Sequence, residues 1–290
     1  MQVINIEHLS KNYGKHIGIK DVTFSLDEGE IFGFVGPNGA GKSTTIRILL
    51  SLIFADGGKA SIMGKDCAKD SKLIKAYTGY VPSDVRLYED IKVSELLRRN
   101  AGFYQKEQEE EAARLCKLFD LETGKRFREL STGNKKKASL VCALASKPRI
   151  LILDEPTSGL DPMVQKDLFM ELKSQAAQGV TILLSSHNLA EVQEYCDRVA
   201  FIRDGKIIAV SDLAGAAKNP RKIISVYGGT QTPNGLELIS EDGNKRIFRT
   251  DSDGAELLKM LCELNPDSFT VQHESIEERF MSLYREEKKQ

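Results

Sequence analysis

The residues with the clearest chemical potential form one glycine-rich run that ends in a lysine and two hydroxyl side chains: Gly36, Pro37, Asn38, Gly39, Ala40, Gly41, Lys42, Ser43 and Thr44. The run fits the pattern G-x-x-x-x-G-K-[ST]. Glycines let the backbone curl so that consecutive N–H groups point at a phosphate, and a helix that begins here would add its positive end. We expect Lys42 to reach the β- and γ-phosphates of a nucleotide and the Ser43 hydroxyl to bind Mg²⁺.

Two carboxylates follow an apolar run later in the chain. Ile150 to Leu153 lead directly into Asp154 and Glu155. At the end of a buried strand both side chains would lie beside the phosphate loop, where Asp154 could hold Mg²⁺ directly or through water and Glu155 could polarise a water as general base. An acidic surface turn is the alternative for this pair taken alone, and the phosphate loop favours the catalytic interpretation.

Two further polar positions occur at the ends of expected elements. Ser131 and Gly133 lie in the run Leu130 to Asn134, at the start of an expected helix, where a serine cap with a glycine nearby can form an anion site. Taken alone, this run is more typical of a plain helix cap. His187 follows the apolar run Val180 to Ser186, which would aim it at the nucleotide, although a lone histidine is often structural.

Strands that alternate with helices are expected to position these residues. The pattern predicts antiparallel strands within residues 1 to 30, then a parallel sheet with helices on its faces. The expected strands are Ile31–Val35, Arg149–Leu153 and Val180–Ser185, with a hairpin at Val199–Val210. The expected helices are Thr44–Leu52, residues 92–121, residues 131–147, Pro162–Ala177 and Leu189–Cys196.

Composition excludes some classes of protein. The chain has 290 residues, of which 41% are hydrophobic and 29% are charged, with a net charge of −1. That balance is ordinary for a globular protein and lacks the basic excess of a nucleic-acid binder. Its apolar runs are too short to span a membrane or to serve as a secretory signal. Five scattered cysteines predict neither disulfides nor a zinc site.

Composition shifts at about residues 214–220, which predicts a domain boundary. We expect residues 1–215 to form the nucleotide-binding domain and residues 216–290 a small α+β accessory domain. The expected elements there are a strand at Lys222–Tyr227, a hairpin turning at Asp242-Gly243, a helix at Gly254–Leu264, a strand at Phe269–Gln272 and a final helix at Ser275–Glu287.

The order of these motifs resembles the ATP-binding subunit of ABC transporters over at least residues 1 to 212. The run at Ser131 resembles that family's signature motif, usually L-S-G-G-Q. Five other landmarks match in order: Tyr13 at the adenine-stacking position, Gly79 to Ser83, Ser158 to Asp161 at the dimer interface, His187 at the position of the histidine that contacts the γ-phosphate, and the hairpin turn Asp204-Gly205. The resemblance implies a P-loop NTPase core with an antiparallel β subdomain and a helical subdomain at about residues 84–147.

The resemblance also implies a mechanism and partners. Two such domains close head to tail on ATP and Mg²⁺, and Ser131 and Gly133 of one subunit meet the γ-phosphate bound by the other. Lys42, Glu155 and His187 would be the catalytic residues, and Asp161 would lie near the nucleotide across the interface. The partners would be membrane-spanning permease subunits and a second ATP-binding subunit, identical or not, at the cytoplasmic face of the membrane. No nucleic-acid partner is expected.

The chain departs from the family pattern at several positions. Ser83 stands where the family has a glutamine that contacts Mg²⁺ and water, which predicts slower hydrolysis or altered coupling rather than loss of ATP binding. Thr132 and Asn134 replace a glycine and a glutamine of the signature motif. The run Lys135 to Lys137 is either a solvated helix start or a group near the partner's phosphates.

The C-terminal run Glu274 to Phe280 is similar to the tail of exporter-type ATPases that serve drugs, antibiotics, peptides or lipids. A generic amphipathic helix is the alternative for that run. For the whole chain, two other functions remain open: a soluble ABC ATPase that acts on ribosomes or DNA, and a regulatory ATPase that only binds its nucleotide. The first usually has two cassettes or a long insertion, and the presence of Glu155 and His187 disfavours the second.

Overall fold

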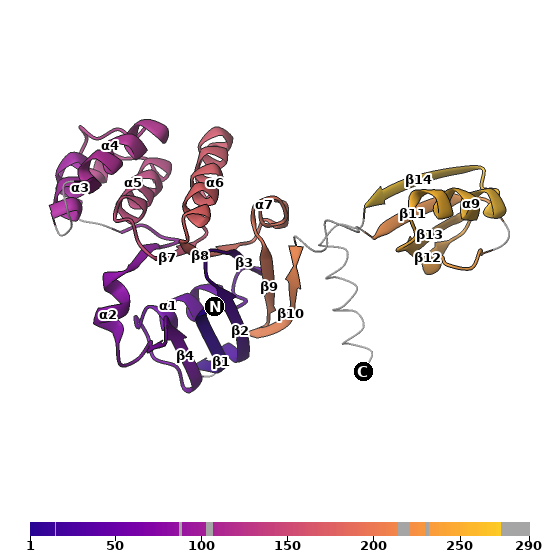
Figure 1. Cartoon of the computed structure of the whole chain (residues 1–290), viewed down its shortest axis with the longest axis horizontal. Coiled ribbons are helices and arrows are strands. Elements are labelled where there is room, and N and C mark those ends of the chain that lie inside the picture. Colours follow the sequence, from indigo (N-terminus) through magenta and orange to yellow (C-terminus); the bar gives the residue numbers. More distant parts are fainter. Residues whose placement is uncertain (15, 87–88, 103–106, 214–220, 230–231, 274–290) are drawn as a thin grey trace. The chain divides into compact units, whose positions relative to one another are not determined.

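The computed structural model of the chain describes all residues except 15, 87–88, 103–106, 214–220, 230–231 and 274–290 (Figure 1). The described chain divides into two compact units, which span Met1–Ser211 and Asp212–Gln290. The expected final helix at Ser275–Glu287, the run Glu274–Phe280 and the composition shift at residues 214–220 lie outside the described residues.

A six-stranded sheet forms the centre of the first unit. Its strand order is β10-β9-β3-β8-β7-β6, and the pairs from β9 to β6 are parallel. Every residue of β3, β7 and β8 is buried, which explains why their sequences are continuous apolar runs rather than alternating ones. The strands are β3 (Ile31–Val35), β6 (Thr78–Val81), β7 (Ile150–Asp154), β8 (Thr181–Ser186), β9 (Arg198–Arg203) and β10 (Lys206–Asp212).

A second, antiparallel sheet of the first unit has the order β2-β1-β4-β5. Its strands are β1 (Gln2–Tyr13), β2 (His16–Asp27), β4 (Gly57–Ile62) and β5 (Lys65–Asp66). Both sheets and α1 contribute to one hydrophobic core, in which the ring of Phe24 from β2 stacks on Phe32 of β3 with centroids 5.3 Å apart. The sequence pattern did not predict β4, β5 or β6.

Helices flank the central sheet, and α3, α4 and α5 pack together as the helical part of this unit (Figure 1). The helices are α1 (Lys42–Leu49), α2 (Ser71–Ala76), α3 (Val93–Gly102), α4 (Glu107–Leu118), the 3₁₀ turn η1 (Phe127–Glu129), α5 (Thr132–Ala145), α6 (Pro162–Ala177) and α7 (Leu189–Tyr195). Polar caps fix where three of them begin, because Ser131, Asp161 and Asn188 each accept a hydrogen bond from the first turn of α5, α6 and α7.

The second unit is an antiparallel sheet of order β12-β13-β11-β14 with one helix. Its elements are β11 (Lys222–Tyr227), β12 (Glu237–Asp242), β13 (Lys245–Thr250), α9 (Gly254–Leu264) and β14 (Ser268–His273). Leu257, Leu261 and Leu264 of α9 pack on Ile224 and Phe248 of the sheet, so this unit has its own core. The predicted fold class is confirmed, whereas the role of residues 216–290 as an accessory domain stays a prediction.

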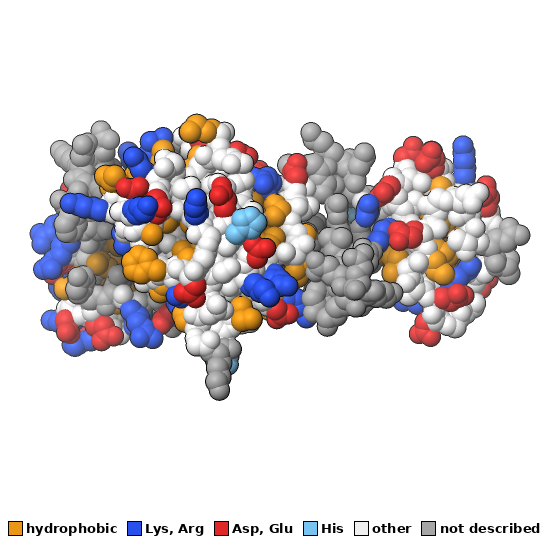
Figure 2. All heavy atoms as spheres, turned by 90° about the horizontal axis from the view of Figure 1, so that it is seen from below, with side chains coloured by type: hydrophobic (Ala, Val, Ile, Leu, Met, Phe, Trp, Pro, Cys, Tyr) orange, Lys and Arg blue, Asp and Glu red, His pale blue; other side chains and the backbone are white. Residues whose placement is uncertain are grey.

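The surface of the first unit is mixed in charge. Figure 2 shows lysine and arginine side chains interspersed with aspartate and glutamate on the face that it draws, in keeping with the net charge of −1. Among the described residues, no helix combines the length and the apolar character needed to cross a membrane.

Candidate active site

Several of the predicted site residues converge at one edge of the central sheet. The strands β3, β8 and β7 are parallel neighbours in which Val35 lies opposite Ser186 and Ser185 lies opposite Asp154, and β6 lies beside β7. The segments that follow these strands therefore leave the sheet at the same edge, which is where open parallel sheets bind ligands. They carry the phosphate loop, Ser83, Glu155 and His187.

The phosphate loop depends on glycine at defined positions. Gly39 and Gly41 have φ angles of 82° and 112°, in the region that favours glycine. A Cβ at Gly36 would overlap the carbonyl oxygen of Ile202. The hairpin after β9 supports the loop from outside, because the Gly205 N–H donates to the Ala40 carbonyl at 3.1 Å. The loop is thus held in a tight curl.

Lys42 begins α1, and its side chain folds back over the loop. The Nζ atom donates to the Gly36 carbonyl at 2.6 Å and to the Pro37 carbonyl at 3.4 Å. The side chain is only 6% exposed, and the ammonium also pairs with Glu155 Oε1 at 3.1 Å. Ser43 and Thr44 are partly exposed in the first turn of the same helix. The positive charge therefore lies inside the curl of backbone that is predicted to hold phosphate.

Asp154 ends β7 and is almost fully buried. Ser185 of β8 holds it: the Ser185 hydroxyl donates to Asp154 Oδ1 at 2.6 Å and accepts from the Glu155 N–H at 3.0 Å. A buried carboxylate needs such a donor, since an ionised group without a partner is costly to bury. The contact fixes Asp154 and also the start of the segment that carries Glu155.

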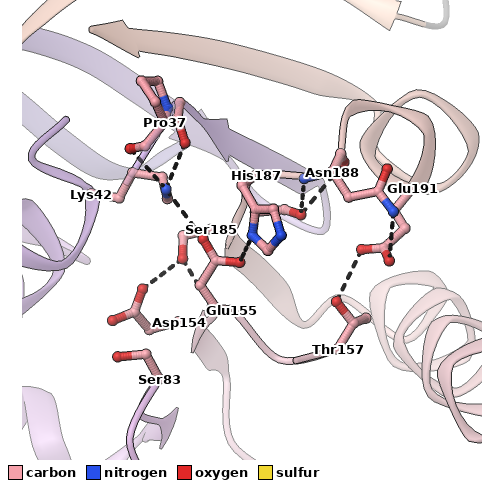
Figure 3. Close-up of polar contacts among 12 residues, drawn as sticks. Pro37, Lys42, Ser83, Asp154, Glu155, Thr157, Ser185, His187, Asn188 and Glu191 are labelled. Carbon is pink, nitrogen blue, oxygen red and sulfur yellow. Dashed lines mark hydrogen bonds and ion pairs between the residues drawn. The ribbon is translucent and has the colours of Figure 1, made fainter. Parts of the chain in front are cut away.

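Glu155 lies between Lys42 and His187, as Figure 3 shows. One carboxylate oxygen pairs with Lys42, and the other, Oε2, is 2.7 Å from Nδ1 of His187. A carboxylate oxygen only accepts, so Nδ1 is the nitrogen that carries the hydrogen. The Glu155 side chain is 15% exposed, whereas His187 is largely open to solvent. The sequence predicted these three residues separately, and the structure brings them into one chain of contacts.

Ser83 follows β6 at the same edge of the sheet, and its backbone has a partner that the sequence did not predict. Lys136 of α5 donates from Nζ to the Pro82 carbonyl at 2.8 Å and to the Ser83 carbonyl at 3.0 Å. The Lys136 side chain is almost fully buried, so the lysine run is not simply a solvated helix start. One lysine among three gave no signal in the sequence that would single it out.

The predicted signature residues lie at the start of α5 and contact the loop before α6. Ser131 Oγ accepts from the Asn134 N–H at 3.2 Å, and a Cβ at Gly133 would lie 2.6 Å from the Gly159 carbonyl oxygen. Asp161 caps α6, and the backbone N–H of Val164 holds the pKa of this carboxyl below its usual range. Ser131, Gly133 and Asp161 therefore share one region, distinct from the Lys42–Glu155–His187 contacts.

Tyr13 ends β1 and is 45% exposed. Its ring passes over Gly18, where a Cβ would lie 2.8 Å from Cε2 of the ring. An exposed ring at the end of a strand could stack on a base, and this role stays a prediction.

A second polar network, also drawn in Figure 3, was not predicted. Glu191 of α7 accepts from the Thr157 hydroxyl and from the Asn188 side chain, each at 3.0 Å. Thr157 follows Glu155 closely, and Asn188 follows His187. The network therefore joins the two segments that carry the Glu155–His187 contact. The sequence offered one signal for it, since Asn188 directly precedes a helix and is a good cap.

Comparisons with known proteins place the chain among nucleotide-binding transport proteins. A family profile described as "ABC transporter" matches residues 19–158. The probable multidrug ABC transporter ATP-binding protein YbhF of Escherichia coli (strain K12) is 36% identical over 212 residues, which cover 71% of this chain and 36% of YbhF. The chain thus spans about a third of the length of this relative.

Two other matches cover more of the known protein. The ABC transporter ATP-binding protein YtrB of Bacillus subtilis (strain 168) is 34% identical over 287 residues, which cover 97% of this chain and 98% of YtrB. A solved structure of an ATP-binding subunit of an ABC transporter aligns with a TM-score of 0.69 and 33% identity, covering 74% of this chain and 92% of that one.

Proposed function

Because the chain belongs to the ATP-binding proteins of ABC transporters, we propose that it hydrolyses ATP and powers an ABC transporter whose membrane-spanning subunits are separate chains. The observation that carries the proposal is the position of Glu155 between Lys42 and His187 at the mouth of the phosphate loop. A protein that only binds nucleotide has no need of a carboxylate held at that point.

Different residues of the site would have different roles in phosphoryl transfer to water. Phosphate oxygens would compete with Glu155 for the Lys42 ammonium and would accept hydrogen bonds from the N–H groups of the loop. A Glu155 carboxylate released from Lys42 would be free to accept the proton of the attacking water. His187 would keep Glu155 oriented through the 2.7 Å contact. Positioning and charge stabilisation would supply most of the catalysis.

The donor set at the sheet edge fits Mg²⁺. Asp154, Ser43 and Ser83 offer only oxygen atoms, which Mg²⁺ prefers, and the described residues contain no cluster of three carboxylate, histidine or cysteine side chains that would hold a metal by themselves. Such a sparse site fits an ion that also binds substrate phosphates. When bound, Mg²⁺ would neutralise charge on the β- and γ-phosphate oxygens.

The position of Ser131 and Gly133 favours a site completed by a second subunit. They lie at the N-terminal end of α5, where backbone N–H groups and the helix dipole attract anions, and Gly133 approaches the Gly159 backbone. We infer a head-to-tail pair in which this end of α5 meets the γ-phosphate bound by the partner. The pair could be two copies of this chain or two different chains.

Export is the proposed direction of transport. The support is the name of the relative YbhF, a probable multidrug ABC transporter ATP-binding protein. The cargo would be a drug, antibiotic, peptide or lipid, and the chain would work at the cytoplasmic face of the membrane. Cargo contacts would lie in the membrane subunits.

The proposal is tested by two measurements on the full chain. Purified protein should hydrolyse ATP in the presence of Mg²⁺ and lose that activity on chelation. The tagged chain, extracted from its native cells with mild detergent, should co-purify in a stable ratio with a multi-span membrane protein. Ribosomal or DNA-repair partners without any membrane protein would overturn the transport role while leaving the ATPase chemistry intact.

A further inference from the structure

Lys136 is a buried cation whose partners are backbone atoms of another segment. Its side chain is 2% exposed, and lysine is almost never this buried unless its charge is compensated. The ammonium donates to two successive carbonyls, those of Pro82 and Ser83, at 2.8 and 3.0 Å. Such a pair of contacts holds the backbone rather than a side chain.

The electrostatic surroundings of Lys136 join it to the site. Burial lowers the pKa of Lys136, and the negative charges of Asp154, Glu155 and Asp84 oppose that shift. The carboxylates that the site uses therefore also help to keep this buried ammonium charged.

The neighbouring lysines have different partners. Lys135 lies over the Phe127 ring, with its Nζ 5.5 Å from the ring centroid, and Lys137 lies 4.0 Å from the Asp161 carboxylate. Of these three consecutive cations, Lys136 is the one with hydrogen bonds to the Pro82–Ser83 backbone. The chain thus offers a matched control one residue away.

We propose that Lys136 is a positioning residue for hydrolysis, which ties the backbone of Pro82 and Ser83 to the start of α5. The inference rests on the proposed ATPase function and extends it. Ser83 reaches the sheet edge beside Asp154 only while its backbone is held there. Since α5 also carries Ser131 and Gly133, any shift of α5 on contact with a partner's phosphate would move Ser83 with it.

The test compares three full-length variants by steady-state ATPase kinetics. Lys136→Met keeps the length of the side chain but removes its donors, so kcat should fall about tenfold while KM for ATP changes less than about twofold. Lys136→Gln keeps an amide donor without the charge and should restore kcat to within about threefold of the wild type. Lys135→Met, which removes the neighbouring charge, should behave as wild type.

A second readout does not depend on hydrolysis. Amide hydrogen exchange at Ser83 to Arg86 should rise in Lys136→Met, whereas Lys136→Gln and Lys135→Met should match the wild type. Unchanged exchange and unchanged kcat in Lys136→Met would overturn the proposal. The proposal would also be overturned if Lys136→Met and Lys136→Gln lost kcat and thermal stability to the same extent, because that result indicates a purely structural role.

The two proposals can fail separately. If the wild-type chain has no ATPase activity, the proposed function is wrong. The amide hydrogen exchange measurement would still decide whether Lys136 holds the Ser83 backbone. If Lys136→Met does not fold, the Lys136→Gln variant carries the test. Amide exchange at Ser83 that is faster than in the wild type, together with a kcat as low as that of Lys42→Met, would contradict a contact that depends on a hydrogen-bond donor.

Discussion

At the scale of single residues, Glu155 is the most constrained group of the site. Its backbone has a φ of 50°, a left-handed conformation that is uncommon for residues other than glycine. The Glu155 N–H donates to the Ser185 hydroxyl oxygen, which holds that conformation, and the carboxylate is shared between Lys42 and His187. Unfavourable backbone conformations concentrate where function needs a side chain aimed in one direction, which here is towards the phosphate loop.

Replacing Glu155 by glutamine should separate binding from hydrolysis. Glutamine has nearly the same shape but is not a base, so we expect the ATPase rate to fall by about 10²- to 10⁴-fold. ATP affinity should stay within about threefold of the wild type or increase, because Lys42 loses a competing carboxylate. Single-turnover hydrolysis and equilibrium ATP binding measure the two effects.

The exposed Glu110 of α4 supplies the control for this experiment. Glu110→Gln makes the same chemical change far from any predicted site residue in the sequence and should leave both quantities unchanged. A wild-type rate of hydrolysis in Glu155→Gln would show that Glu155 is not the general base.

Ser83 stands where the resemblance to the family predicts a glutamine. A serine hydroxyl reaches less far than a glutamine amide, so Ser83→Gln should raise the ATPase rate several-fold, on the order of 1 kcal/mol in the barrier. The comparison needs Ser83→Ala, which should not raise the rate. An unchanged rate of hydrolysis and of transport in Ser83→Gln would show that this departure has no functional effect.

At the scale of elements, the site depends on where helices begin and on how closely their ends approach. The polar caps Ser131 and Asp161 start α5 and α6. Between these caps the Gly133 backbone approaches the Gly159 carbonyl so closely that no side chain fits. Because both sides of this contact are backbone, neither can move aside cheaply, and the two helix starts are coupled.

Gly133→Ala should therefore disturb the region between α5 and α6. Alanine normally stabilises a helix by about 1 kcal/mol relative to glycine, but here its Cβ would lie 2.6 Å from the Gly159 oxygen. We expect a net loss of about 1 kcal/mol in the free energy of unfolding and a lower ATPase rate, with ATP binding to the phosphate loop retained. Denaturant unfolding and ATPase assays measure these effects.

Gly124 provides a matched control, since a Cβ there would meet no atom within 4 Å. Gly124→Ala should change the free energy of unfolding by less than about 0.5 kcal/mol and leave hydrolysis intact. If both alanine variants behave alike, the close approach of Gly133 and Gly159 has no energetic consequence.

At the scale of the whole molecule, each compact unit has its own hydrophobic core. The first core joins the two sheets and α1, and the second is built from α9 and the sheet of β11 to β14. All predicted site residues belong to the first unit, Met1–Ser211. Separate cores favour independent folding of each unit.

A shortened chain of residues 1–220 should therefore fold and bind ATP with an affinity within about threefold of the full chain. Thermal unfolding and equilibrium ATP binding test this expectation. If the second unit is an accessory domain for assembly or control, co-purification with membrane subunits should weaken while ATP binding persists. A shortened chain that aggregates or binds no ATP would show that the first unit depends on the second.

The sequence by itself was sufficient for features that are encoded locally. The phosphate loop is recognisable because glycine spacing and one lysine define its backbone, and the parallel strands stand out because burial on both faces demands continuous apolar runs. The start of the helix after Ser131 was predictable from its serine cap. The strands β4 and β6 were missed because each contains glycine, which weakens the strand pattern. The strand β5 was missed because it has only two residues, both of them charged.

Only the tertiary structure decided which of these residues meet. The contacts of Glu155 with Lys42 and His187, the support of Asp154 by Ser185, and the burial of Lys136 against the Ser83 backbone all join segments distant in sequence. They depend on the order of β3, β8, β7 and β6 in the sheet and on how α5 packs against β6. A local pattern specifies the conformation and burial of its own segment, whereas strand order and helix packing arise from the free energy of the whole core.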